Sequence, residues 1–310
     1  MTYEVKTPTR LSLFGGGSDL PIFSDKYGGA VVSLAINLYQ RINATFSTHK
    51  SITFPENGSI KFYSTFINET ELPDMQYDFT FDGKIHSGVG SSASCGVGIV
   101  ALANQINKWH MTKFDIAKLA WEIEVNRVGL YGGKQDQYAA SLGGFNLLEF
   151  NTNRVVRSQI KNTKIIDSIV LFDTGLRRND TKVQEGFKNL KDIQIKTLQK
   201  IKDMAYDSLE YIETNDIEVL GEMLNTAWEL KKKSNKVTNK GIDNLYKKAI
   251  ELGALGGKLM GSGGGGYMFF LVEPNTKEQF ISKITNILGL KHIPFELDTR
   301  GVVVKIIRES

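Results

Sequence analysis

Hydrophobic and polar positions predict a strand-rich beginning to the chain. Residues 30–46 are mostly apolar and β-branched, which is typical of a strand. Residues 52–66 and 77–81 alternate weakly between apolar and polar side chains, with turn formers such as the Pro-Glu-Asn-Gly of residues 55–58 among them. We therefore expect a sheet in the N-terminal part, with further strands over 52–66 and 77–81.

Helical spacing begins at Ser92, after which Val97, Val100 and Ala101 recur on one face, and a second helix is expected to start near Thr112. Further elements are predicted as follows: a strand at 165–172, a long helical stretch with apolar residues from Phe187 to Leu209, a helix at 242–252, and strands at 267–272 and 302–307. This mixture predicts an α+β fold.

Length and composition add a domain count and exclude several classes of protein. At roughly 100 to 200 residues per domain, a chain of 310 residues is expected to form two domains, 1–160 and 161–310. The 41% of hydrophobic and 23% of charged residues are ordinary globular usage, which excludes wholesale disorder. The 38 basic and 34 acidic residues are interspersed, so no nucleic-acid partner is expected.

Cysteine usage and the absence of long apolar runs indicate a compartment. Cys95 is the only cysteine and cannot form an internal disulfide, and the first residues lack the apolar stretch of a secretory signal. No apolar run approaches the roughly 18 residues that a membrane helix needs. These features predict a cytoplasmic protein without a membrane partner.

The 30 glycines, against 6 prolines, gather at a few places. The first cluster, residues 15–17, follows a stretch that contains Arg10 and precedes Ser18 and Asp19. Three consecutive glycines remove every Cβ from the end of a strand, so a ligand can approach the backbone or the chain can turn sharply. A plain tight turn and a binding loop are both open.

The second cluster runs from Gly88 to Ser94 and leads directly into the helix that carries Val97. A glycine loop at a helix N-terminus exposes unpaired N–H groups and the positive end of the helix dipole, which together suit a phosphate. Ser91 and Ser92 add hydroxyls for phosphate oxygen or a metal ion. The alternatives are a serine that only caps the helix and a dinucleotide-binding G-x-G-x-x-A fingerprint. The fingerprint predicts a βαβ unit near the N-terminus, whereas here a long strand-rich segment comes first.

The third cluster comprises Gly261, Ser262 and Gly263 to Gly266, immediately before the strand expected at 267–272. Four consecutive glycines lose much conformational entropy on folding. Their presence favours a close approach of the backbone to another segment over a plain hairpin.

Two glutamates lie on the helix expected at 113–127. Residues two apart point roughly 200° from each other on a helix, so only one of Glu122 and Glu124 can face the interior. Glu124 shares its face with apolar residues, whereas Glu122 lies four residues from Lys118, as in a solvated ion pair. Glu124 is therefore the candidate for chemistry.

A third acid, Asp136, lies in a glycine-led helix start at residues 132–140. The helix dipole favours an ionised carboxylate there. An ordinary first-turn acid and a functional carboxylate are both compatible with this position.

In this order, the three glycine clusters resemble the galactokinase, homoserine kinase, mevalonate kinase and phosphomevalonate kinase (GHMP) superfamily over residues 7–267. Residues 88–94 are similar to its phosphate loop, with Val89 where leucine is usual. Residues 261–265 are similar to its Gly-Ala-Gly-Gly-Gly segment, with Ser262 in place of alanine.

Within the superfamily, residues 10–19, 133–138 and 256–261 most resemble the D-glycero-D-manno-heptose 7-phosphate kinases. The resemblance implies a two-domain fold with the active site in the cleft between the domains. It implies transfer of the γ-phosphate of ATP to the anomeric C1 hydroxyl of a sugar phosphate, giving the heptose 1,7-bisphosphate.

The resemblance also implies roles for individual residues. Asp136 accepts the proton of the attacking hydroxyl, and Arg10 lies close to Asp136 and to the transferred phosphoryl group. Glu124 and Ser92, or alternatively Ser91, hold Mg²⁺ between the phosphates of ATP. The loop that cradles these phosphates consists of Gly88, Val89, Gly90, Ser91, Ser92, Ala93 and Ser94. The residues implied at the acceptor are Gly16, Gly17, Ser18, Asp19, Lys134, Gln135, Arg177, Arg178, Gly263, Gly264 and Gly265.

Arg177 and Arg178 form an adjacent pair in the turn after the strand expected at 165–172. A guanidinium group matches phosphate bidentately. One of the two, with help from Lys134, is expected to bind the phosphate already on the sugar; the alternative is a solvated pair on the surface.

Other functions compete with this interpretation. A fucokinase- or galactokinase-like enzyme would act on a free sugar. A nicotinamide-dependent oxidoreductase would use Gly88, Gly90 and Ala93 but leaves Asp136 and the other glycine clusters unexplained. An inactive sugar sensor on the same fold would have lost catalytic groups, whereas Glu124 and Asp136 are present.

Overall fold

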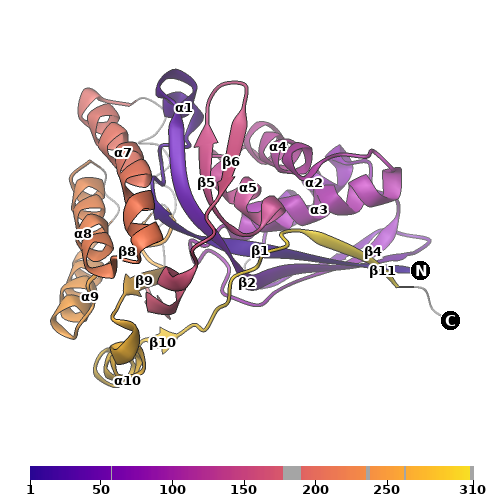
Figure 1. The fold of residues 1–310 in the computed structure, drawn as a ribbon. Helices are drawn as coiled ribbons and strands as arrows, with labels where there is room; N and C mark the ends of the chain where they lie inside the picture. The colour runs from indigo at the N-terminus through magenta and orange to yellow at the C-terminus, as the bar shows by residue number, and fades with distance from the viewer. Residues whose placement is uncertain (57, 177–189, 235–237, 262, 308–310) are drawn as a thin grey trace.

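A seven-stranded sheet forms the centre of the N-terminal part of the molecule (Figure 1). The computed structural model describes residues 1–56, 58–176, 190–234, 238–261 and 263–307. The strands of this sheet are β1 (Thr2–Phe14), β2 (Gly29–Phe46), β3 (Ser51–Thr53), β4 (Met75–Phe81), β5 (Phe145–Phe150), β6 (Val155–Gln159) and β11 (Val303–Ile307). They lie in the order β11-β1-β2-β4-β3, and β5 pairs with β2 and with β6. The β3–β4 pairing is parallel and the others are antiparallel.

Four helices pack on one side of this sheet (Figure 1). They are α2 (Ile60–Glu69), α3 (Ser91–Asn107), α4 (Lys113–Ile123) and α5 (Gln135–Leu142), and the short helix α1 (Pro21–Tyr27) follows β1. A capping box between Thr112 and Asp115 starts α4, which confirms the expected helix start. A π-helical turn (Glu124–Val128) continues α4.

The second sheet has four strands in the order β10-β7-β9-β8. Its strands are β7 (Ile169–Asp173), β8 (Gly256–Leu259), β9 (Tyr267–Leu271) and β10 (Lys291–His292), and a 3-10 turn (Lys164–Ser168) precedes β7. The helices of this half are α7 (Asp192–Thr214), α8 (Ile217–Ser234), α9 (Lys240–Glu251) and α10 (Lys277–Leu288), with a 3-10 turn at Pro274–Thr276 before α10. Figure 1 shows α7 running along the side of β1 and β2, with α8 next to α7.

The two halves share one hydrophobic core. Its buried residues from the first sheet include Leu11, Leu34 and Phe145, and those from the second half include Leu171 and Phe269. These side chains are fully or almost fully excluded from solvent. The long strands β1 and β2 therefore serve as the wall on which the second half packs.

Helix α2 corrects the prediction of a strand over 52–66. Residues 51–53 do form β3, but residues 60–69 are helical. Phe62, Tyr63, Phe66 and Ile67 are buried on one side of this helix, and a Cβ on Gly96 of α3 would lie 2.5 Å from the Phe66 ring. Aromatic and β-branched residues suggested a strand, but their i, i+4 spacing and the bare surface of α3 select a helix.

Other elements agree with the pattern more closely. The strands expected at 30–46, 77–81, 267–272 and 302–307 and the helices expected after 92, after 112 and at 242–252 are all present. The strand expected at 165–172 starts only at Ile169, because a 3-10 turn occupies the residues before it. Phe187 lies outside the described residues.

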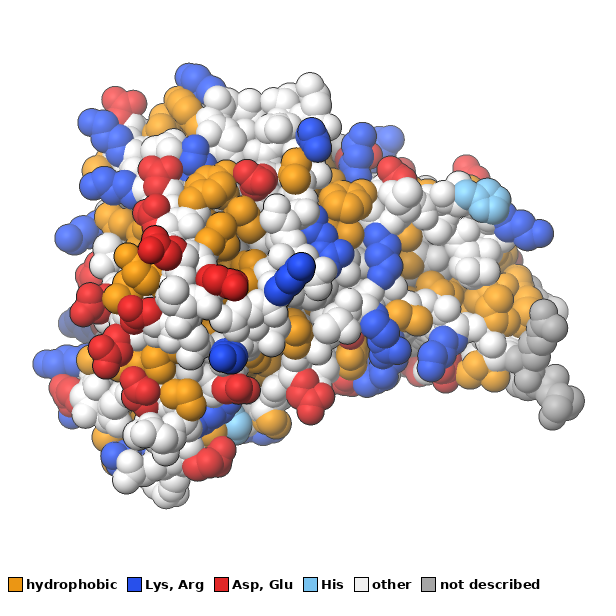
Figure 2. All heavy atoms as spheres, viewed as in Figure 1, with side chains coloured by type: hydrophobic (Ala, Val, Ile, Leu, Met, Phe, Trp, Pro, Cys, Tyr) orange, Lys and Arg blue, Asp and Glu red, His pale blue; other side chains and the backbone are white. Residues whose placement is uncertain are grey.

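Charges on the face shown in Figure 2 are mixed, with acidic and basic side chains interspersed over the helices of the second half. This agrees with the even distribution of charge along the sequence. Within the described residues, no helix is both long and apolar enough to cross a membrane.

Candidate active site

The second glycine cluster forms a turn that opens helix α3. Gly88 and Gly90 have φ of +87° and +78°, a region that favours glycine. Gly90 is the residue before the first turn, and α3 begins at Ser91. Because the first N–H groups of a helix lack partners within it, the loop and this helix end together can bind phosphate oxygens.

The third glycine cluster lies against this loop. A Cβ on Gly88 would be 2.5 Å from the Met260 carbonyl oxygen, and one on Gly261 would be 2.8 Å from the Gly88 Cα. At the start of β9, the Tyr267 N–H donates to the Ser87 carbonyl at 2.8 Å. The expected close approach of backbone is confirmed, and it joins the second half of the molecule to the loop.

Arg10 connects the loop to Asp136. Its Nε and one terminal nitrogen donate to the two carboxylate oxygens of Asp136 at 2.8 and 2.7 Å, and the other terminal nitrogen donates to the Gly88 carbonyl at 2.6 Å. The Arg10 side chain is 5% exposed and that of Asp136 is 25% exposed. The carboxylate is therefore fixed beside the phosphate loop yet remains accessible to a ligand.

Gly90 has a second reason to lack a side chain. A Cβ at this position would lie 3.0 Å from an Asp136 carboxylate oxygen. Asp136 is the second residue of α5, so the start of α5 and the start of α3 meet at this point.

The two glutamates separate as the helical pattern predicts. Glu124 is buried, whereas Glu122 lies 3.9 Å from Lys118 in an exposed ion pair. Burial raises the pKa of Glu124 to about 7; a hydrogen bond from Ser92 opposes the shift and the charge of Asp136 adds to it. Gln137 also donates to the Glu124 carboxylate, at 2.5 Å.

Ser92 and Glu124 fit a magnesium ion. Mg²⁺ prefers oxygen ligands and is usually held by one or two carboxylates together with substrate phosphates. The two side chains are within hydrogen-bond reach of each other beside the loop, and no cation of the described chain pairs with Glu124. The described residues contain no cluster of three or more His, Cys, Asp or Glu side chains, so the remaining ligands of such an ion would be substrate phosphates and water, and the magnesium site stays a prediction.

Asp19 lies close enough to Asp136 for the charge of Asp136 to act on its carboxylate. Its carboxylate accepts hydrogen bonds from the Gln135 N–H and side-chain amide, both at 3.0 Å, and from the Gly17 N–H at 2.9 Å. Burial raises its pKa. A Cβ on Gly133 would lie 1.9 Å from Asp19, so the glycine at this position makes room for the carboxylate.

Two serines assigned to the site from sequence have other partners. The Ser94 hydroxyl donates to the carbonyls of Thr7 and Pro8, and its N–H donates to Gly90, so a direct phosphate contact by Ser94 does not fit. The Ser18 hydroxyl holds the first glycine turn by bonding to Gly15 and Ala30.

Lys134 is also engaged, because its ammonium lies 3.3 Å from Asp25 of α1 and over the Trp121 ring. Of the other residues predicted at the acceptor, the structure describes the glycines but not the two arginines. Gly263, Gly264 and Gly265 all have positive φ in the turn before β9. Arg177 and Arg178 lie outside the described residues.

Gln137 is a residue that the sequence analysis missed. It stands in the same first turn as Gln135 and Asp136, and its side-chain amide orients Glu124. The sequence could have pointed to Gln137 only because it follows Asp136 directly. Its contact with Glu124, 13 positions earlier, becomes visible only in the fold.

Comparison with known families assigns the chain. Residues 59–144 match the GHMP kinases N terminal domain and residues 208–288 match the GHMP kinases C terminal domain. The chain is 32% identical to the D-glycero-alpha-D-manno-heptose 7-phosphate kinase of Campylobacter jejuni over 91% of this chain and 93% of that protein. The chain therefore belongs to the GHMP kinases.

Two further relatives refine this assignment. The galactokinase of Pyrococcus furiosus is 28% identical over 87% of this chain and 88% of its own. The crystal structure of a D-glycero-D-manno-heptose 1-phosphate kinase from Bacteroides thetaiotaomicron aligns with a TM-score of 0.80 and 27% identity, covering 99% of this chain and 100% of that one. The predicted fold, a GHMP kinase with N- and C-terminal domains, is confirmed.

Proposed function

We propose that this chain is an ATP-dependent sugar kinase that phosphorylates the anomeric C1 hydroxyl of D-glycero-D-manno-heptose 7-phosphate, giving the 1,7-bisphosphate. The similarity to a heptose 7-phosphate kinase supports the substrate. The observation that carries the reaction is the Arg10–Asp136 pair, because it holds an accessible carboxylate against the phosphate loop.

In the proposed reaction, the C1 hydroxyl oxygen attacks the γ-phosphorus of ATP, its proton passes to Asp136, and ADP leaves. Both Asp136 oxygens accept from Arg10, but each carboxylate oxygen has further lone pairs for the hydroxyl. The Arg10 guanidinium group donates to the Gly88 carbonyl, so its positive charge lies beside the phosphate loop. There it can offset the negative charge of the transferred phosphoryl group. Most of the rate in phosphoryl transfer comes from such positioning and electrostatic stabilisation.

Mg²⁺, bound by Ser92 and Glu124, would neutralise charge on the ATP phosphates. The chain's own contribution is to keep the Glu124 carboxylate available. Gln137 orients it, and burial keeps bulk water away from it.

The galactokinase relative favours one alternative, a kinase of the same fold that acts on a free sugar. In both cases Asp19 and Gln135 are proposed to bind sugar hydroxyls. The Gln135 side-chain oxygen is buried without a hydrogen-bond partner among the described residues, so it is ready to accept one from a ligand.

The test is to mix the protein with Mg-ATP and a panel of sugars and sugar phosphates, and to follow ADP release. Phosphorus NMR of the product then shows where the new phosphate is. We expect heptose 7-phosphate to be preferred and to acquire a phosphate at C1. Faster turnover of free galactose or fucose would contradict the substrate, and a phosphate elsewhere on the sugar would contradict the position.

A further inference from the structure

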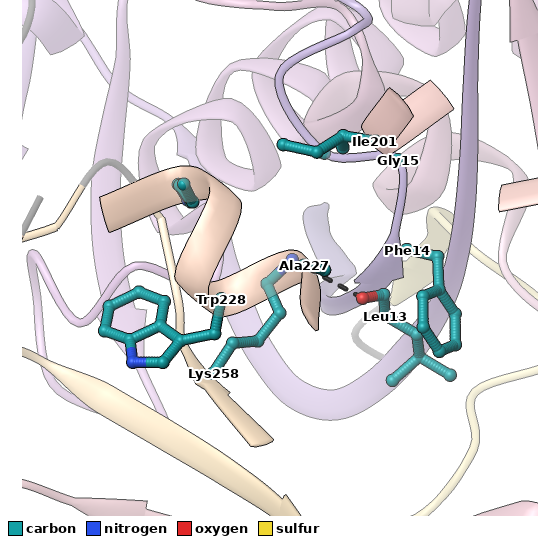
Figure 3. Close-up of a pocket in the computed structure, with 9 residues that line it drawn as sticks. Leu13, Phe14, Gly15, Ile201, Ala227, Trp228 and Lys258 are labelled. Atoms are coloured by element: carbon teal, nitrogen blue, oxygen red, sulfur yellow. Dashed lines mark hydrogen bonds between the residues drawn. The ribbon is translucent and has the colours of Figure 1, made fainter. Parts of the chain in front are cut away.

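A buried lysine on β8 faces the acceptor side of the candidate site. Lys258 lies on the fully buried strand β8 and is 8% exposed. Figure 3 shows its side chain extending from β8 toward the Leu13 carbonyl at the end of β1, past Ala227 and Trp228. The walls around it come from β1 and the first glycine turn, from α7 and from α8.

The Lys258 ammonium lacks a strong partner within the described part of the chain. Its one recorded hydrogen bond there is to the Leu13 carbonyl, at 3.5 Å. Burial lowers its pKa, the charges of Lys231 and Arg10 lower it further, and only Asp19 acts in the opposite direction. Asp19 is more than an ion-pair distance away, since no salt bridge joins the two. A buried cation in this situation is stabilised when an anion is brought to it.

Further polar groups gather at the same place. A Cβ on Gly16 would lie 2.7 Å from the Ser12 hydroxyl, 3.6 Å from the Gln135 amide nitrogen and 3.7 Å from the Lys258 ammonium. The Ser12 hydroxyl and the Gln135 side-chain oxygen are buried and unpaired among the described residues. Buried polar groups normally have partners, so this cluster points to a polar ligand next to Gly16.

We propose that Lys258 binds the phosphate that the acceptor sugar already carries, with the Ser12 hydroxyl as a second donor. This inference rests on the proposed function, since it assumes a phosphorylated acceptor. Lys258 lies on the Asp19 and Gly16 side of the site, whereas the transferred phosphoryl group lies between Gly88 and Asp136. The ammonium is therefore a specificity determinant for the acceptor and takes no part in the transfer itself.

The experiment compares kcat/KM for heptose 7-phosphate and for unphosphorylated heptose in the wild type and in Lys258→Met. A charge-assisted hydrogen bond is lost only for the phosphorylated acceptor, so we expect its kcat/KM to fall about tenfold to a hundredfold. The value for free heptose should change less than about threefold, by the same reasoning. Lys258→Arg should keep part of the preference, because it keeps the charge.

Lys248→Met is the matched control, because Lys248 is exposed on α9 and pairs with Glu251 at the surface. ATP affinity should be unchanged in all variants. Should Lys258→Met fail to fold, Lys258→Gln and Lys258→Arg give the same comparison.

Each of the other possible results contradicts either the proposed function or the role of Lys258. A wild type that prefers free heptose refutes the proposed function. A wild type that prefers heptose 7-phosphate, with the preference intact in Lys258→Met, refutes the role of Lys258 alone. An equal loss for both acceptors also refutes it, since Lys258 would then serve the transfer or the fold. Loss of the preference in Arg177→Ala or Arg178→Ala, but not in Lys258→Met, would place the phosphate at those arginines.

Discussion

Arg10 joins Asp136 to the phosphate loop through its guanidinium group and its backbone. It bonds to both oxygens of Asp136 and to the Gly88 carbonyl, and its own N–H donates to Val89. A lysine could not reproduce this geometry, because an ammonium cannot offer two parallel donors in a plane. The position of the carboxylate relative to the phosphate loop is therefore set by a single side chain.

Replacing Asp136 with asparagine should abolish most phosphoryl transfer. Loss of a positioned base typically lowers the rate by about 10²- to 10⁴-fold. ATP affinity should stay within a few-fold, because this carboxylate is assigned to the sugar hydroxyl. Steady-state turnover and calorimetric titration with ATP measure the two quantities.

A matched control exists on the surface. Asp82 accepts the same two-pronged hydrogen bond from Arg41, at 2.9 and 2.8 Å, in a pair whose side chains are 37% and 33% exposed. Asp82→Asn should leave turnover near the wild-type value. Near-normal turnover in Asp136→Asn would mean that another group takes the proton.

At the scale of elements, helix α4 and its π-helical extension decide which glutamate enters the site. Glu124 opens the π-helical turn and is buried, while Glu122 remains on the exposed side with Lys118. Turns of this kind are frequent at functional sites. Helical periodicity alone was enough to choose between the two residues.

Glu124→Gln should raise the Mg²⁺ concentration needed for half-maximal activity by about tenfold or more, since loss of a group that holds or orients a metal typically weakens binding to that extent. Glu122→Gln should change it less than twofold, because an exposed ion pair contributes little. Activity measured over a range of Mg²⁺ at saturating ATP provides the test. Similar losses in both variants would contradict the assignment of Glu124.

The glycine clusters show what could be predicted from sequence. The runs of consecutive glycines already predicted close contact between backbone segments. The approach of Gly261 to Gly88 confirms this prediction. Helix α2 could not be recognised from its residue types, because its aromatic residues fit a strand equally well. Their i, i+4 spacing and the packing on Gly96 select a helix. Lys258 and Ser12 were missed for a related reason: their surroundings come from segments more than 200 positions apart.

At the scale of the whole molecule, the shared core makes the two halves depend on each other. Leu11 and Phe145 pack in the same cluster as Leu171, Leu224 and Phe269. A division near residue 160 stays a prediction about domains, and it passes through the middle of this cluster. Neither half can bury its part of the core alone.

Calorimetric heating should therefore give a single unfolding transition, with equal calorimetric and van't Hoff enthalpies. A fragment of residues 1–160 should lack the near-ultraviolet circular dichroism of packed aromatic side chains. Two well-separated transitions, or a cooperatively folding fragment, would show that the halves are independent.

The pairing of β11 with β1 has a consequence for the order in which the protein is made. Thr2 to Lys6 are synthesised about 300 residues before their partners on that edge, residues 303–307. Until residues 303–307 have been synthesised, that edge of β1 has no strand beside it. An unpaired strand edge is a template for other chains, so newly made copies depend on the prompt arrival of β11 to avoid joining one another.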